Sequence, residues 1–426
     1  MWRQKRASLI AVLILFPAVL MAQFNNNTTS PYSRFGLGDL QRGSVGRSSA
    51  MGGAILGSRS NQQINLANPA SYTSTDSLSF LFDFGVKAGF SSFKNDISSF
   101  STNNINFNYF AFSFPVTNRI GVGMGLTPFS DTGYDVQMIE EEETYGQVWH
   151  RYNGEGSISK AYLGLGVEPI KNISIGANLY YLFGKLSRNA NVSFLEAIDL
   201  YSNQKYEQIR LRDFGISYGL QATLPFNEKQ QLTLGLTFEN KPEFTAFHSD
   251  ITQKILTNGT TTDIDTVNSI DDVKDIIKLP RSYGIGLSYT SNEKLEINAD
   301  YIHQKWSEAT FFGKTNPFLA DLNRYAIGFE YVPDIYSIRG YFDKVAYRAG
   351  ISYEDYYLMF GDQQLTDIGI SFGVGLPIYR SLSMVNISAE LGRRGKTSYN
   401  LVREYYARLT LSINFYDVWF IKRKYD

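Results

Sequence analysis

Apolar residues alternate with small or polar residues along most of the chain beyond residue 77. In the stretch DIGISFGVGLP, the residues Ile368, Ile370, Phe372, Val374 and Leu376 occupy every second position. A period of two places successive side chains on opposite faces of a β-strand. The alternation recurs in about fourteen segments and predicts sheet throughout. These segments are residues 78–86, 105–114, 120–126, 161–167, 173–183, 214–222, 232–238, 283–289, 295–301, 325–331, 345–353, 368–376, 385–391 and 407–415.

The connections between these segments are alternately short and long. The short ones are rich in Pro, Asn and Lys and are residues 115–118, 168–172, 225–229, 290–294 and 377–381, with a longer exception at 333–343. The long polar ones are residues 91–103, 129–147, 187–206, 248–279 and 304–322. Short turns at one end and long loops at the other are typical of a bacterial outer membrane barrel.

Charged residues within these segments, or directly next to them, share one face. They are Asp83, Lys87, Lys160, Glu239, Glu296, Asp300, Glu330, Arg348, Glu390 and Arg408. A charge that faces lipid at the membrane midplane costs about 2–4 kcal/mol, so this face belongs in the lumen of a barrel. A soluble sandwich is the alternative, but its loops need not alternate in length. We therefore predict an all-β fold, a fourteen-stranded antiparallel transmembrane β-barrel.

Tryptophans and the N-terminus agree with export to an outer membrane. Trp149, Trp306 and Trp419 lie at the ends of predicted segments, where aromatic girdles of barrels belong. The chain begins MWRQKRASLIAVLILFPAVLMAQ, in which basic residues precede an apolar run and the small residue Ala22. A membrane anchor helix is the alternative, but Pro17 and the short run favour a cleaved signal peptide over residues 1–22.

Glycines recur on the lumen face. They include Gly121, Gly123, Gly125, Gly164, Gly166, Gly284, Gly286, Gly369, Gly373 and Gly375. Glycine lets other backbone approach the wall, although sheet curvature alone is an alternative reason. Residues 23–76 show little alternation and are rich in Gly, Ser and Asn, so we predict a plug there, a barrel over 77–420 and a periplasmic tail over 421–426. Within the plug, residues 36–43 (GLGDLQRG) make a poor phosphate loop, because no strand precedes them.

Composition disfavours several classes of protein. The chain has no cysteine, three histidines that are far apart, and a formal net charge of -1. It therefore offers no thiol nucleophile, no histidine pair for a metal and no basic surface for nucleic acid. An outer membrane hydrolase is a remote alternative, since the acids Glu296 and Asp300 are better explained as lumen charges paired with Arg348 or Arg408. We predict no enzyme activity and no cofactor.

Several motifs resemble the FadL-type outer membrane transporters of long-chain fatty acids and other hydrophobic compounds, in the version common in Bacteroidota. The motifs are AMGGA at 50–54, NLANPASY at 65–72, GVGMGLTPF at 121–129, LPRSYGIGLSYTSNEKLEINADYIHQKWS at 279–307, and the ending FYDVWFIKRKYD. The resemblance implies passive, ligand-gated diffusion of a hydrophobic molecule through a barrel closed by an N-terminal hatch. It also implies lateral exit into the membrane at a kink in the third strand.

The resemblance also suggests site residues. In this sequence, Asn68, Pro69 and Ala70 match the hatch motif, and Gly52 and Gly53 belong to the motif before it. The kink region of the third strand contains Gly121, Gly123, Gly125 and Pro128. For ligand capture we select apolar residues in two long loops, where packing over the barrel mouth is an equal alternative: Phe194, Leu195, Phe311, Phe312, Phe318 and Leu319.

Two functions follow from these observations. The first is uptake of hydrophobic, fatty acid-like molecules across the outer membrane, with membrane lipid as the acceptor. The second is an accessory or structural subunit without transport, because FadL-like barrels also serve in type 9 secretion and barrel assembly. Its partners would be other envelope proteins, with contacts at residues 140–143 (EEEE) and 422–424 (KRK).

Overall fold

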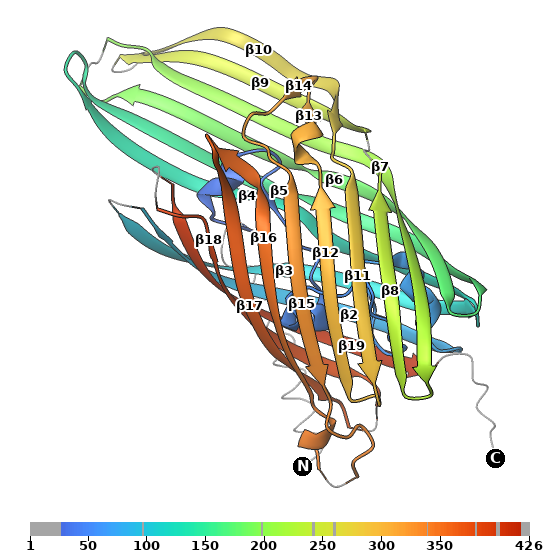
Figure 1. Ribbon diagram of the computed structural model, residues 1–426. Helices are drawn as coiled ribbons and strands as arrows, with labels where there is room; N and C mark the ends of the chain where they lie inside the picture. The colour runs from blue at the N-terminus through green and yellow to red at the C-terminus, as the bar shows by residue number, and fades with distance from the viewer. Residues whose placement is uncertain are drawn as a thin grey trace, which may run out of the picture.

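A closed antiparallel barrel of 14 strands forms the body of the protein (Figure 1). The computed structural model describes residues 27–95, 98–196, 199–240, 243–258, 261–338, 340–379, 381–397 and 401–418. The strands, in order around the barrel, are β2 (Ser79–Lys94), β3 (Ser99–Thr117), β4 (Ile120–Glu142), β5 (Gly146–Ile170), β6 (Ile173–Phe194), β7 (Ser202–Asn227), β8 (Gln230–Glu239), β11 (Ser282–Ser291), β12 (Leu295–Gln304), β15 (Leu322–Tyr331), β16 (Ala346–Phe360), β17 (Gln363–Pro377), β18 (Met384–Arg394) and β19 (Arg403–Val418). β19 pairs with β2 and closes the ring. Every predicted segment overlaps one of these strands, so the predicted barrel is confirmed.

The two faces of the wall follow the predicted parity. Glu296, Asp300 and Arg348 are buried inside the barrel, whereas Ile297 and Leu163 on the opposite face are exposed. An outer face of large apolar side chains over a polar interior is the arrangement that lipid requires. No helix among the described residues is long and apolar enough to cross a membrane.

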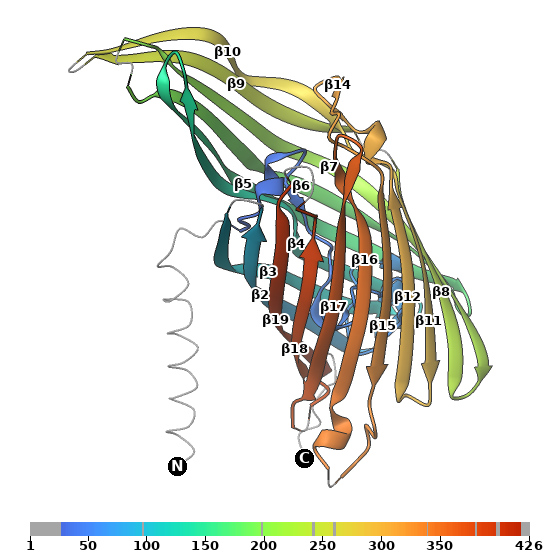
Figure 2. The same cartoon turned by 60° about the vertical axis from the view of Figure 1, so that its left-hand side comes forward.

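The predicted long loops are largely wrong, because the strands continue through them. β4 and β5 remain paired as far as Glu142 and Gly146, where residues 129–147 had been predicted to form a loop. Residues 248–279 belong mostly to a hairpin of β9 (Glu243–Asn258) and β10 (Thr261–Lys278), and β9 pairs with the first half of β7. Beyond the membrane both faces of a strand meet water, so a strand there needs no apolar alternation. The barrel is consequently much taller on one side (Figure 2).

The N-terminal segment, residues 27–78, lies inside the barrel and contains η1 (Pro31–Arg34), β1 (Asp39–Leu40), η2 (Gly46–Ala50) and η3 (Pro69–Ser74) (Figure 1). Its backbone touches the wall at lumen-facing glycines. A Cβ atom on Gly121 would overlap the carbonyl of Tyr72, and one on Gly350 would overlap the backbone of Met51 and Gly52. Close approach of two backbones therefore explains these glycines.

Other lumen glycines have different neighbours. A Cβ atom on Gly369 would meet the side chains of Glu390, Ser352 and Tyr406, and one on Gly375 would meet Met384 and Arg348. These positions give room to side chains of the wall rather than to the N-terminal segment.

The prediction that Trp306 belongs to an aromatic girdle is wrong. Trp306, in the short η4 (Trp306–Glu308), is 2% exposed and packs on Tyr357 with the ring centroids 4.7 Å apart. It belongs to an apolar cluster under the barrel mouth, because its connection folds inward over the lumen. Trp149 lies in the tall part of β5 and is partly exposed. Trp419, the predicted signal peptide, the predicted periplasmic tail and the basic run 422–424 lie outside the described residues.

Candidate functional site

The hatch motif joins the N-terminal segment to the wall. Asn68 is fully buried, and its side chain caps η3 by accepting a hydrogen bond from the Ala70 N–H at 3.1 Å. Its Nδ2 donates to the carbonyl of Leu56 at 3.0 Å and to that of Leu220 on β7 at 3.2 Å. Pro69 occupies the first turn of η3, where its missing N–H costs nothing, and it packs against Gly176 of β6.

Replacing Asn68 with alanine should lower the free energy of unfolding by about 1–2 kcal/mol, because the N-cap bond to Ala70 is lost. Urea-induced unfolding in detergent micelles measures this change. Asn61→Ala is the matched control, since Asn61 makes one exposed hydrogen bond, to Asp76 at 2.8 Å. Equal losses for both variants would contradict an anchoring role for Asn68.

The Gly52–Gly53 pair occupies a turn that other residues rarely adopt. Their φ angles are 63° and 81°. The Gly52 N–H donates to Ser371 Oγ at 2.8 Å, and its carbonyl accepts from Arg324 Nη2 at 2.9 Å. A Cβ atom on Gly53 would overlap the Arg324 guanidinium. Glycine is needed at both positions because of backbone conformation and close contact.

Two arginines of the N-terminal segment form ion pairs with buried acids of the wall. Arg42 lies 2.7 Å from Asp367, 2.7 Å from Glu390 and 3.3 Å from Glu354. Arg47 Nη2 lies 2.5 Å from Glu296. Neither arginine was among the site residues predicted from the sequence. A signal was available in the sequence. Both arginines lie in the segment predicted to be a plug, and the lumen face of the predicted strands carries acidic residues with which they could pair.

These contacts correct the predicted partners of two lumen acids. Glu296 pairs with Arg47, and Asp300 accepts the backbone N–H groups of Ile55 at 2.6 Å and Leu56 at 2.9 Å. Neither acid forms an ion pair with Arg348 or Arg408 among the described residues. Both acids therefore hold the N-terminal segment instead of pairing with these arginines of the wall.

Asp39 in β1 adds a further ion pair. Its carboxylate lies 2.8 Å from Arg394 and accepts a hydrogen bond from the Tyr356 hydroxyl at 2.7 Å. Burial opposes the charge of this carboxylate, but Arg394 and Arg408 outweigh burial and hold the pKa of Asp39 below its usual range. The carboxylate therefore stays ionised where it anchors β1.

The third barrel strand separates from the second strand after Leu126. β3 and β4 pair only from Thr117↔Ile120 to Phe110↔Leu126, whereas β4 stays paired with β5 to Glu142. A bulge follows between Pro128 and Ser130. We call the region where β3 and β4 no longer pair the seam. β1 partly fills it by pairing with β4 at Asp131 and Ser130.

The predicted kink residues fall on both sides of this point. Gly121 and Gly123 lie in the regularly paired part of β4 and face Tyr72, and a Cβ atom on Gly125 would overlap the carbonyl of Phe110. Pro128 lies at the bulge, where its missing N–H removes a ladder hydrogen bond. Of the four residues, Pro128 is the one at the seam.

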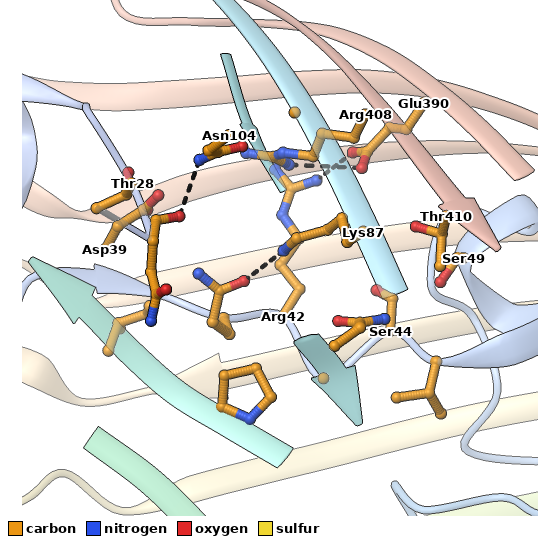
Figure 3. Close-up of a pocket in the computed structure, with 18 of the residues that line it drawn as sticks. Thr28, Asp39, Arg42, Ser44, Ser49, Lys87, Asn104, Glu390, Arg408 and Thr410 are labelled. Atoms are coloured by element: carbon orange, nitrogen blue, oxygen red, sulfur yellow. Dashed lines mark hydrogen bonds and ion pairs between the residues drawn. The ribbon is translucent and has the colours of Figure 1, made fainter. Parts of the chain in front are cut away.

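Two small cavities lie inside the barrel. The seam cavity, of about 80 Å³, is lined mainly by polar and charged groups, among them Asp39, Arg42, Lys87 and Arg408 (Figure 3). Asn108 lines it as well. A second cavity, of about 130 Å³, lies between Phe129, Trp306 and Arg324. Both are much smaller than the roughly 300–1,000 Å³ of typical ligand sites. An apolar groove of about 730 Å³ is lined by outward-facing residues of β5–β8 and β11, such as Leu165 and Ile285.

The predicted capture residues form two groups. Phe311, Phe312 and Leu319 join the apolar cluster under the barrel mouth, and Phe318 packs on Phe35 with the ring centroids 4.9 Å apart. Phe194 instead contacts Tyr145 at the tall end of the wall, and the neighbouring Leu195 is exposed. The structure does not bring the six residues together.

Comparisons with known proteins agree with this architecture. The sequence model of the BamG family matches residues 4–426, and no curated protein matches the chain. The CymD monoaromatic hydrocarbon channel is 13% identical, with a TM-score of 0.56, over 88% of this chain and 98% of that one. The Pseudomonas putida toluene transporter TodX is 16% identical, with a TM-score of 0.57, over the same shares of the two chains. A Pseudomonas aeruginosa FadL homologue is 10% identical, with a TM-score of 0.55, again over 88% and 98%. The likeness concerns the fold, and it confirms the predicted FadL-type barrel.

Proposed function

Because the chain belongs to the BamG family, and because its own N-terminal segment fills its lumen, we propose that it is a FadL-like accessory subunit of an outer membrane machine. The filled lumen is the observation that carries this proposal. Arg42 and Arg47 form ion pairs with buried acids of the wall, and the seam cavity and the cavity beside Trp306, both lined by described residues, have volumes of about 80 and 130 Å³. A barrel closed in this way is suited to holding partners rather than conducting solutes.

The tall side of the barrel offers a surface for such partners. The extensions of β4 and β5 expose Met138 and Ile139 next to the acidic run 140–143, and the β9–β10 hairpin exposes Ile264 and Val267. Exposed apolar side chains beyond the membrane are candidates for contact with a partner protein. The family name favours barrel assembly over type 9 secretion as the machine concerned.

Affinity purification from the native outer membrane in mild detergent tests this function. We expect a defined set of barrel assembly proteins and no stoichiometric apolar molecule, when proteins and small molecules are identified by mass spectrometry in one sample. As a matched pair, Ile139→Lys on the tall side should weaken the complex, whereas Ile327→Lys on the lipid side should prevent membrane insertion instead. Recovery of the barrel alone with a bound hydrophobic compound would contradict the proposal.

Passive transport of hydrophobic molecules is the second candidate function. The seam between β3 and β4 supports it, since the third strand loses its pairing with β3 after Leu126, close to the bulge at Pro128. In this reading the hatch residues Asn68, Pro69 and Ala70 act as the gate, and a fatty acid-like or aromatic compound leaves sideways into the membrane. Lateral exit requires that Asn27, which bonds Asp131 of β4 at 3.0 Å, moves out of the seam.

Liposomes that contain the purified barrel distinguish the two functions. An accessory subunit should leave the uptake of a labelled long-chain fatty acid or of toluene at the rate of protein-free liposomes. Asn68→Ala, which loosens the hatch, should then change nothing. Uptake well above that rate, altered by Asn68→Ala but not by the control Asn61→Ala, would establish transport.

A further inference from the structure

The wall has an unusual residue at the inner end of the seam. In β3 the pairing with β2 shifts between Gly85↔Tyr109 and Val86↔Phe107, so Asn108 is the extra residue of a β-bulge. A bulge turns its extra side chain away from the regular alternation. Asn108 consequently points into the seam cavity, where it is 6% exposed. Within the part of the chain that the structure describes, its Nδ2 has no hydrogen-bond partner.

Lys87, on the neighbouring strand, lines the same cavity. Its Nζ donates to Gln41 Oε1 at 2.7 Å, and the amide of Gln41 is held in turn by Asp131 at 2.8 Å. Among the described residues, no carboxylate lies within 4 Å of Nζ to form an ion pair with it. An ammonium group carries three donors, so Lys87 retains capacity for a further acceptor.

Other cations surround this pair of donors. Arg42 and Arg408 also line the cavity and share the carboxylate of Glu390, at 2.7 Å and 3.4 Å (Figure 3). Four cationic and three acidic side chains line the cavity in all, and the fourth cation, Arg394, is paired with Asp39. Arg42 is also paired with Asp367 and Glu354. Lys87 is therefore the cation of this lining without an acid of its own among the described residues.

We propose that the seam cavity binds a phosphate group through Lys87 and Asn108. The donors come from different strands and from the N-terminal segment, so they surround a bound group on several sides. The four tetrahedral oxygens of a phosphate suit this arrangement better than the two coplanar oxygens of a carboxylate. A volume of about 80 Å³ accommodates a headgroup but not an acyl chain. This inference goes beyond the proposed function, since it requires neither transport nor a partner protein.

Two sources of phosphate have access to the cavity. Asn104 of β3 and both Thr127 and Pro128 of β4 line it, so it borders the inner end of the seam. Asn27 spans the seam: its carbonyl accepts from Asn104 Nδ2 at 2.8 Å, and its Nδ2 donates to Asp131. A lipid headgroup would enter past Asn27, whereas free phosphate would enter through the lumen.

Titration of the whole detergent-solubilised barrel with inorganic phosphate, followed by calorimetry, tests the site. In parallel, barrels in nanodiscs of phosphatidylcholine with or without phosphatidic acid are examined for retained lipid by native mass spectrometry. We expect Lys87→Met and Asn108→Asp each to weaken binding at least tenfold, while Lys87→Arg retains it. Lys160→Met is the matched control, because Lys160 faces the lumen outside this cavity, 3.8 Å from Glu239.

The outcomes separate the sources. Binding of inorganic phosphate that depends on Lys87 supports a site for the free ion, and selective retention of phosphatidic acid that depends on Lys87 supports a headgroup site. Binding of neither probe overturns the proposal, as does binding that Lys87→Met leaves unchanged. Asn108→Asp preserves the size of the side chain. Loss of binding in this variant with folding intact, judged by heat-modifiable migration on gels, therefore cannot be ascribed to a collapsed barrel.

Discussion

Replacing Arg42 with methionine should lower the free energy of unfolding by about 3–5 kcal/mol, because the buried acids Asp367 and Glu354 and the partly buried Glu390 would lose a shared cation. The side chain of Arg42 is 11% exposed, and that of Asp367 is fully buried. Removing one member of a buried charge network leaves uncompensated charge in a place that water does not reach. Urea-induced unfolding in detergent micelles measures the change.

Arg151→Met is the matched control for this variant. Arg151 also forms a close ion pair, with Asp135 at 2.9 Å, but both side chains are exposed on the tall part of the wall. Exposed pairs of this kind contribute about 0–1 kcal/mol. If Arg42→Met were no more damaging than Arg151→Met, the N-terminal segment would not be held by its charges, and the proposal of a permanently filled lumen would lose its main support.

A leucine at Gly350 should destabilise the protein by about 3 kcal/mol or more and open the lumen. The new side chain would occupy the space of the Met51–Gly52 backbone, which cannot move aside as a side chain can. The least costly response is displacement of the N-terminal segment. We therefore expect ion conductance in planar bilayers for Gly350→Leu and none for the unmodified protein.

The control is Gly369→Leu on the adjacent strand, at a position of the same parity. Its neighbours are the ends of the side chains of Glu390, Ser352 and Tyr406, at 2.8–3.1 Å from a Cβ atom, and these can shift. We expect a smaller loss of stability, about 1–3 kcal/mol, and no conductance. Conductance through both variants, or through neither, would contradict the idea that the N-terminal segment seals the barrel at Gly350.

The lining of the lumen, and not the fold, distinguishes between the two candidate functions. Channels for hydrophobic compounds share this barrel, so the architecture alone does not separate a channel from an accessory subunit. Here the cavity at the seam is lined largely by charged and polar groups. Apolar compounds gain nothing from such a lining, because burial of apolar surface needs an apolar partner. The same lining suits the phosphate group inferred for Lys87 and Asn108.

Part of the candidate site was predictable from local motifs. The hatch residues Asn68, Pro69 and Ala70 were selected by resemblance, and all three lie at a contact between the N-terminal segment and the wall. The capture residues were selected only for being apolar and in long connections. That criterion does not identify a common site, and Phe194 lies apart from Phe318 and its neighbours in the structure.

The sequence by itself determined the barrel, the number of its strands and the face of each strand. Lipid penalises a charge at every outward position, so each membrane-crossing segment alternates apolar residues with small or polar ones, as residues 368–376 do. Beyond the membrane this constraint ends. The extensions of β4 to β7 and the β9–β10 hairpin lack this alternation, so they could not be predicted as strands from the sequence.

Only the tertiary structure decided how the lumen is filled and where the wall separates. Arg42 and Glu390 are 348 residues apart, and no local pattern relates them. The seam likewise depends on which strands pair: β4 keeps its partner β5, loses β3 after Leu126, and gains β1 from the N-terminal segment. Alternation specifies which face of a strand a residue occupies, but not which group lies opposite it. The groups that lie opposite one another close this lumen and place charged side chains around the seam cavity, where we infer that a phosphate group binds.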